Sequence, residues 1–250
     1  MNERPVPVAK PLPALRVESM DGGFGIMAGD QPWRTPAGNN LVGPTRALAE
    51  VLMTEISAAR AVQKNHRVRM DDLGHTRLAA TAIDRIGPAI EATREALLAF
   101  ASTDLVCYRD VGGSPLRERQ DTTWQPLLEW LAETYGARLI VVDGVMPQPQ
   151  PQSALDALDA VLNRCDRFVL AGFGLAVETA GSLAIGLALA DGKIDAAQAS
   201  ALADLDEMYQ NEQWGEDDEA LAKRRLSAAD IALASHFLTL LKTSHAGTQP

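Results

Sequence analysis

Cysteine is scarce in this chain of 250 residues: only Cys107 and Cys165 are present, and neither stands in a CxxC or Cys-His spacing. A disulfide framework and the usual zinc sites are therefore excluded, and two free thiols are typical of a reducing compartment. Residues 1–19 carry charges and four prolines where a secretory signal would have an apolar segment. We expect a cytoplasmic, bacterial protein.

Basic residues are also in deficit, because 23 Lys and Arg stand against 33 Asp and Glu, for a net charge of -10. Non-specific binding to nucleic acid or to anionic membranes needs a basic surface, so the charge argues against both. The acidic residues are concentrated between Asp204 and Glu219. That segment is either a solvated surface or a site for a basic partner, and charge alone favours the solvated surface.

The motifs that carry common chemistry are missing as well. The sequence has no GxGxxG after a strand, no GxxxxGK[ST], no GxSxG and no HExxH, so no nucleotide, catalytic or cofactor site is predicted. Four histidines are scattered, and Asp72 with His75 is the nearest approach to a metal pair. His236 lies beside an apolar helical stripe, which favours a structural role. No metal site is predicted.

One long apolar segment is present at residues 168–190, with Glu178 as its only charge. Its apolar residues lie on all sides of a helix, which is typical of a buried core helix or of a membrane span. Glu178 divides it into pieces of ten and twelve residues, each shorter than the ~20 needed to cross a bilayer. We therefore expect one buried helix, or two helices broken near residues 178–181, rather than a membrane-attached protein.

Glycine and proline divide the beginning of the chain into short extended segments. Residues 16–20 and 25–28 are strand candidates joined by Asp-Gly-Gly, which favours a hairpin turn. Another turn is expected at Gly29-Asp30, and residues 33–36 and 41–44 flank a further one at residues 37–40. These segments predict a small antiparallel sheet of about four strands.

Helical spacing of apolar residues prevails after the sheet, over residues 46–63, 70–86, 89–101 and 116–135. Gly87-Pro88 is expected to interrupt or kink the chain. Pro126 would lie in a first turn if the last of these helices began near Thr122. Residues 138–142, RLIVV, are the clearest later strand candidate, and we expect them to join the N-terminal sheet.

Proline and glutamine alternate in residues 146–152, MPQPQPQ, which is the composition of a linker. Everything beyond this segment is expected to be helical. The sequence predicts an α+β protein with two domains. Residues 1–148 would form a small domain with an antiparallel sheet plus helices, and residues 149–250 an all-α helical bundle with one buried apolar helix.

The acidic segment is the best candidate for a binding surface. Asp195 and Gln198 form a capping-box pattern that begins a helix running to about residue 213. Carboxylates mixed with tryptophan, tyrosine and glutamine suit recognition of a partner better than a purely solvated face. The alternative is a helical-domain enzyme or a metal-binding protein that uses the acidic cluster 204–219, but the sequence supplies no clear pocket or second catalytic group.

Several blocks of the sequence resemble the assembly chaperones of the F-type ATP synthase head, the family that holds the alpha subunit before it joins beta. The blocks occur in the family's order. They are residues 33–39 (WRTPAGN), 44–49 (PTRALA), 76–84 (TRLAATAID), 104–109 (DLVCYR), 124–130 (WQPLLEW), 179–183 (TAGSL) and 205–217.

The resemblance implies an N-terminal α+β domain, a C-terminal orthogonal helical bundle, and neither catalysis nor a nucleotide cofactor. It implies that the chain, as a monomer, binds a free alpha subunit and prevents its aggregation. Our hypothesis places Glu207, Glu212, Trp214, Glu216 and Asp217 in the client surface. Trp214 could instead anchor the core, in which case the segment would lose its exposed aromatic group.

Overall fold

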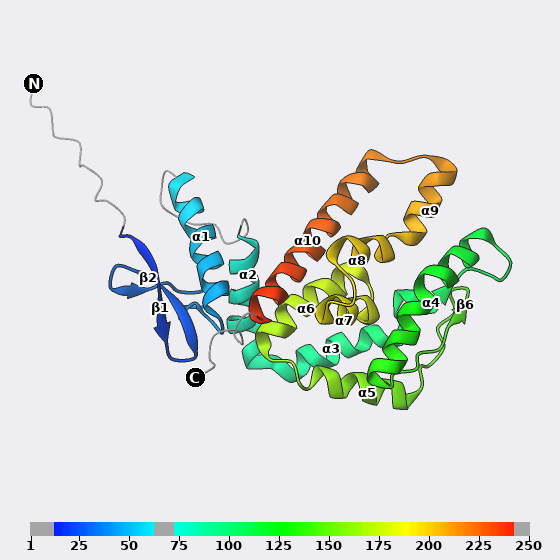
Figure 1. Cartoon of the computed structure of the whole chain (residues 1–250), viewed down its shortest axis with the longest axis horizontal. Helices are drawn as coiled ribbons and strands as arrows, with labels where there is room; N and C mark the ends of the chain where they lie inside the picture. The colour runs from blue at the N-terminus through cyan, green and yellow to red at the C-terminus, as the bar shows by residue number, and fades with distance from the viewer. Residues whose placement is uncertain (1–12, 63–72, 243–250) are drawn as a thin grey trace, which may run out of the picture.

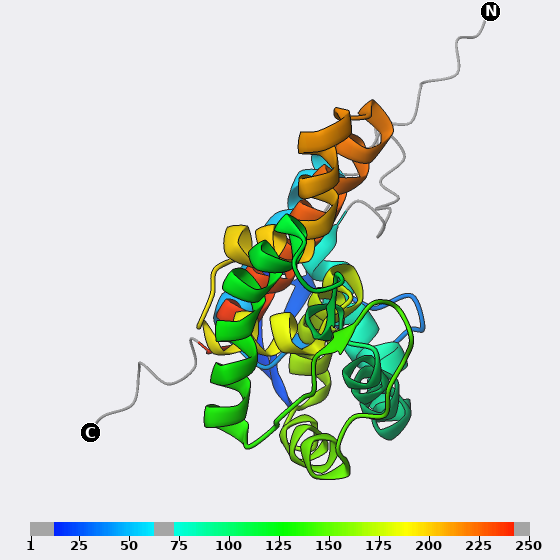
Figure 2. The same cartoon turned by 90° about the vertical axis from the view of Figure 1, so that its right-hand side faces the viewer.

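The computed structural model describes residues 13–62 and 73–242 and shows an α+β protein, as predicted (Figures 1 and 2). A small sheet lies at one end of the molecule and adjoins a larger helical body. The proline-rich arm before residue 13 and Asp72 of the candidate metal pair lie outside the described residues. Among the described residues, no helix combines the length and the apolarity that a membrane span needs.

The predicted hairpin and small antiparallel sheet of four strands are confirmed, but the strand expected at residues 33–36 contributes only an isolated bridge between Arg34 and Asn40. Strands β1 (Leu15–Met20) and β2 (Gly23–Ala28) pair antiparallel, and β3 (Gln31–Pro32) and β4 (Val42–Gly43) both pair with β2. Gly23 has φ +142°, and a Cβ atom there would lie 2.2 Å from the carbonyl oxygen of Gly43. Glycine is therefore required where β2 meets the end of β4. Helix α1 (Arg46–Val62) packs on this sheet.

The strand predicted at residues 138–142 is wrong. Only β6 (Val142–Asp143) is extended in a ladder, and it pairs parallel with β5 (Tyr108–Arg109) in a separate two-stranded sheet. The buried side-chain amide of Gln150 explains the difference, because it accepts from Ile140 N at 2.8 Å and donates to Ile140 O at 3.1 Å. A side chain thus takes the backbone groups that a neighbouring strand would use.

Helix α2 (Gly74–Thr81) continues into a π-helical turn, η2 (Ala82–Ile86), then a 3-10 turn, η3 (Gly87–Ala89), and helix α3 (Ile90–Ser102). The interruption expected at Gly87-Pro88 is confirmed. Helix α4 (Pro115–Tyr135) begins earlier than the position that would put Pro126 in its first turn. The Ser114 hydroxyl accepts from Arg117 N at 3.0 Å and starts this helix, so Pro126 lies inside it.

The apolar segment forms two buried helices, α6 (Arg167–Ala180) and α7 (Leu183–Asp191), which confirms the break expected near Glu178. Gly181 ends α6 at φ +64°, and the Ser182 hydroxyl accepts from Ile185 N at 3.0 Å to begin α7. Helix α6 packs against α7 and against the long α10 (Asp218–Lys242). The core therefore runs through the middle of the helical body.

Three more helices complete the body: α5 (Gln152–Leu162), α8 (Ala196–Ala203) and α9 (Leu205–Trp214). The capping box of Asp195 and Gln198 is confirmed. The single helix expected from it to about residue 213 is wrong, because Asp204 leaves the helical conformation at φ -93° and ψ 6°. The break turns α9 away from α8 and buries Leu205 in the core.

Helices from both sides of residue 148 pack together, α3 with α6 among them, and the domain boundary stays a prediction.

Alanine substitutions at two glycines, one in α6 and one in α7, should change the free energy of unfolding in opposite directions. A Cβ atom on Gly186 would lie 2.4 Å from the Val177 side chain, whereas one on Gly174 would lie 3.7 Å from Leu97, an ordinary contact. We expect Gly186→Ala to lower the free energy of unfolding by about 1–2 kcal/mol through overpacking. Gly174→Ala should raise it by up to about 1 kcal/mol through helix propensity. Urea unfolding of both variants tests this, and equal losses would contradict the packing described.

Candidate functional site

The acidic segment forms a corner of the molecule, made of α9 and the beginning of α10 and here named the acidic corner (residues 204–219). It lies at the end of the helical body away from the sheet, and Figure 2 shows it projecting beyond the neighbouring helices. Its sixteen positions hold eight acids and no Lys or Arg. The five residues predicted for the client surface, Glu207, Glu212, Trp214, Glu216 and Asp217, all lie on it.

Trp214 is 79 % exposed at the end of α9, which contradicts the alternative that it anchors the core. Gly215 ends the helix with φ +91°, as expected of a helix stop. Met208, on the same helix, is also exposed. A tryptophan left in water offers a large, rigid apolar surface, which is typical of the residues that dominate binding energy in protein interfaces.

Arg224 of α10 connects α9 to the turn between α9 and α10. Its side chain is 12 % exposed, forms an ion pair with Glu216, and brings Nε within 3.5 Å of the Glu207 carboxylate. Removing one carboxylate would leave a largely buried guanidinium less well compensated. Glu207 and Glu216 therefore fix the shape of the corner, whatever else they contact.

Arg119 of α4 joins the corner to the helical body. Its two terminal nitrogens each donate to a Glu212 oxygen at 2.8 Å, and its guanidinium lies 5.1 Å from the centre of the Tyr209 ring. The bidentate hydrogen bond lowers the pKa of Glu212. Nothing in the sequence identifies Arg119, which lies 93 positions before its partner.

Asp217 and Asp206 differ in environment. Asp217 is exposed at the beginning of α10, where its carboxylate accepts from Glu219 N at 3.3 Å. Burial raises the pKa of Asp206, and its carboxylate accepts from the Gln120 amide at 2.8 Å. No group of three or more His, Cys, Asp or Glu within the described ranges could hold a metal ion. The Asp217 carboxylate thus lies at the surface, whereas Asp206 is held against α4.

His75 of the candidate metal pair has other partners. Its Nδ1 lies 2.7 Å from a Glu55 oxygen and its Nε2 lies 2.9 Å from Nδ1 of His236. The Glu55 carboxylate also accepts from the backbone N of His75 and from Thr76. These contacts tie α1, α2 and α10 together, so His75 and His236 serve the packing of helices.

Two of the matching sequence blocks, residues 33–39 and 76–84, meet at Asp84. Its carboxylate accepts from the Thr35 hydroxyl at 2.7 Å, from the Asn39 amide at 2.8 Å and from Ala37 N at 3.1 Å. Burial alone would raise the pKa of Asp84, but these hydrogen bonds outweigh it and lower the pKa. The contact fixes the π-helical turn η2 against the loop that follows β3.

Comparisons with known proteins identify relatives of this chain. A family model described as "ATP12 chaperone protein" matches residues 14–132. The mitochondrial protein atp12 of Schizosaccharomyces pombe is 28% identical over 167 residues, which are 61% of this chain and 56% of that protein. The chain thus spans little more than half the length of this curated relative.

Solved structures match over more of the chain. The crystal structure of Atp12 from Paracoccus denitrificans is 33% identical with a TM-score of 0.85, over 92% of this chain and 96% of that one. A structure from Agrobacterium tumefaciens is 38% identical with a TM-score of 0.83, over 91% of this chain and 84% of that one. Both likenesses combine sequence identity with a shared fold.

Proposed function

Because this chain belongs to the ATP12 chaperone family, we propose that it binds the free alpha subunit of F-type ATP synthase and prevents its aggregation until beta arrives. An apolar subunit interface is an aggregation hazard while its partner is absent. A chaperone must cover that interface and later release it. A mostly polar surface with a few apolar anchors suits this exchange better than a large apolar face.

The observation that carries this proposal is the exposed Trp214 on a corner with eight acids and no base of its own. Trp214 and Asp217 would contact the client directly. Glu207, Glu212 and Glu216 would add negative charge while their arginine partners hold them in place. The partner surface would be basic with an apolar pocket. The resemblance to this family favours a monomer, and the two free thiols favour the cytoplasm.

Aggregation of purified alpha subunit tests the function. We expect an equimolar amount of this chain to suppress the light scattering of alpha subunit diluted from denaturant, and added beta subunit to release it. An equal amount of an unrelated acidic protein is the control. Scattering that this chain leaves unchanged would contradict the proposal.

A charge swap separates contact from structure at Glu212. Glu212→Lys should weaken binding of the alpha subunit about fivefold, as expected of a charge at the rim of an interface. The double variant Arg119→Glu with Glu212→Arg restores the ion pair but moves the negative charge. We expect it to bind as weakly as Glu212→Lys when affinity is measured by calorimetry. Full recovery would show that Glu212 acts only through Arg119.

A further inference from the structure

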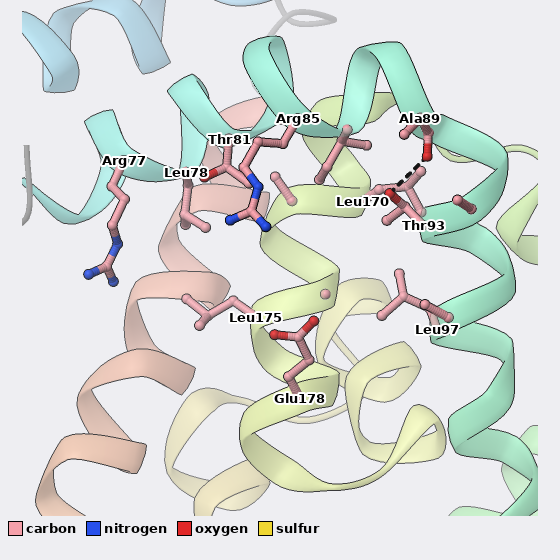
Figure 3. A pocket seen from close by; sticks show the side chains of 15 residues that line it. Arg77, Leu78, Thr81, Arg85, Ala89, Thr93, Leu97, Leu170, Leu175 and Glu178 are labelled. Carbon is pink, nitrogen blue, oxygen red and sulfur yellow. Dashed lines mark hydrogen bonds between the residues drawn. The ribbon is translucent and has the colours of Figure 1, made fainter. Parts of the chain in front are cut away.

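A groove lies between α2, η2 and α3 on one side and α6 on the other, and we name it the α3–α6 groove (Figure 3). Its volume is about 700 Å³. The floor is apolar and comes from four helical segments. It consists of Leu78, Ile86, Leu97, Leu170, Ala171 and Gly174. Gly174 leaves open the space over α6 that a side chain would fill.

Opposite charges face each other across this floor. Arg85 comes from η2 and Glu178 from α6, and in Figure 3 both side chains point toward the space between the two walls. Both are exposed, and neither has a hydrogen bond or an ion pair with any residue of the described ranges. Within the part of the chain that the structure describes, the groove therefore presents one unpaired cation and one unpaired carboxylate beside an apolar floor.

The backbone at Arg85 is held in place by the residue before it. The preceding residue, Asp84, holds the 35–39 loop through three hydrogen bonds, and it does not line the groove. A π-helical turn is rare and is found frequently at functional sites. Because the backbone of η2 is already ordered, it loses less entropy when a ligand binds.

We propose that the α3–α6 groove binds an extended segment of the client polypeptide, a deepening that rests on the proposed function. An aliphatic side chain of that segment lies over Gly174, an acidic side chain pairs with Arg85, and a basic side chain pairs with Glu178. The two walls carry opposite charges beside an apolar floor, so a complementary ligand carries both charges and an apolar group. An extended peptide can supply these groups from alternate residues, because every second side chain of an extended chain lies on the same face.

Filling the groove tests the proposal. Ala96 is exposed on α3 and lines the groove, whereas Ala160 is equally classed as exposed, on α5, and does not. Ala96→Trp should weaken alpha-subunit binding at least about tenfold, and Ala160→Trp should change it less than about twofold. Far-ultraviolet circular dichroism and thermal unfolding check that both variants fold.

Charge reversal at Arg85 gives a second test of the groove. Arg85→Glu should weaken binding about tenfold, whereas Arg138→Glu, at an exposed site outside the groove, should leave it unchanged. A photo-crosslinking residue at position 96 of the otherwise unaltered chain should label one client peptide in which an aliphatic residue has an acidic neighbour. Position 160 should label no such peptide.

The outcomes separate this proposal from the one it rests on. An unaltered chain that binds no alpha subunit would overturn the proposed function and the occupant of the groove together. An unaltered chain that binds, with Ala96→Trp binding equally well and no crosslink from position 96, would overturn the groove alone. Loss of binding in Ala96→Trp and Arg85→Glu, with both controls unaffected, supports it.

Discussion

Replacing Asp104 by alanine should lower the free energy of unfolding by about 3–5 kcal/mol, because several buried backbone donors would lose their acceptor at about 1–3 kcal/mol each. Asp104 is fully buried. Its oxygens accept from Val106 N at 3.2 Å and from Ala184 N at 3.0 Å, so the side chain joins the end of α3 to the beginning of α7. Asp195→Ala is the matched control: an exposed helix cap, expected to cost only about 1 kcal/mol in urea unfolding.

The pH dependence of the free energy of unfolding should also reflect the burial of Asp104. Burial raises the pKa of Asp104 from 3.8 to about 6, despite the hydrogen bonds from Ser182 and from the backbone of residues 106, 183 and 184. A carboxyl whose pKa is higher in the folded state stabilises the fold below the unfolded pKa and loses that contribution as the pH rises past the folded pKa. The wild-type chain should therefore lose up to about 3 kcal/mol through this group between pH 4 and pH 7.

Asp104→Asn isolates this effect, since asparagine does not ionise. The stability of the wild type relative to Asp104→Asn should fall as the pH rises from 4 to 7. A difference that stays flat, or that rises with pH, would show that Asp104 is not a buried carboxyl of raised pKa.

Replacing Trp214 by alanine should weaken binding of the alpha subunit about thirtyfold, the loss expected of an aromatic anchor worth about 2 kcal/mol. The side chain is 79 % exposed, so the free energy of unfolding should change by less than about 0.5 kcal/mol. Binding calorimetry and urea unfolding of the same preparations measure both quantities.

Met146→Ala is the control for Trp214, because Met146 is 74 % exposed and lies outside the acidic corner. It should leave the affinity unchanged. If Trp214→Ala binds as tightly as the wild type, the acidic corner loses its proposed anchor. If Trp214→Ala loses stability instead, the tryptophan has a packing role that its exposure does not reveal.

Local signals in the sequence predicted local structure well. Asp21-Gly22 predicted the β1–β2 hairpin because glycine accepts the positive φ of its turn, +83° at Gly22. The pair Asp195 and Gln198 predicted the beginning of α8, since each side chain caps a backbone group of the other. The break at Gly181 followed from a glycine placed beside the only charge of the apolar segment.

The failures come from contacts between distant residues. Residues 138–142 have the composition of a strand, but Gln150 takes the backbone groups of Ile140, and no alternation of apolar residues predicts a side chain that does so. Pro126 was compatible with a first turn until Ser114 and Pro115 started the helix earlier. In both cases a single competing hydrogen bond or cap decides the outcome.

The sequence identifies the residues of the acidic corner but not the contacts that shape it. Composition identified the acids and Trp214, whereas their partners Arg119 and Arg224 depend on how α4 and α10 pack against α9. The α3–α6 groove had no sequence signal at all, because its lining comes from two distant parts of the chain, residues 77–97 and 170–178.

The most direct test of client choice is a pull-down from bacterial cytosol in which the tagged chain, at equal loading, is offered free alpha and free beta subunits. We expect alpha to be retained in clear excess over beta, and Trp214→Ala to remove most of that excess. Equal retention of both subunits, or retention of neither, would contradict this expectation.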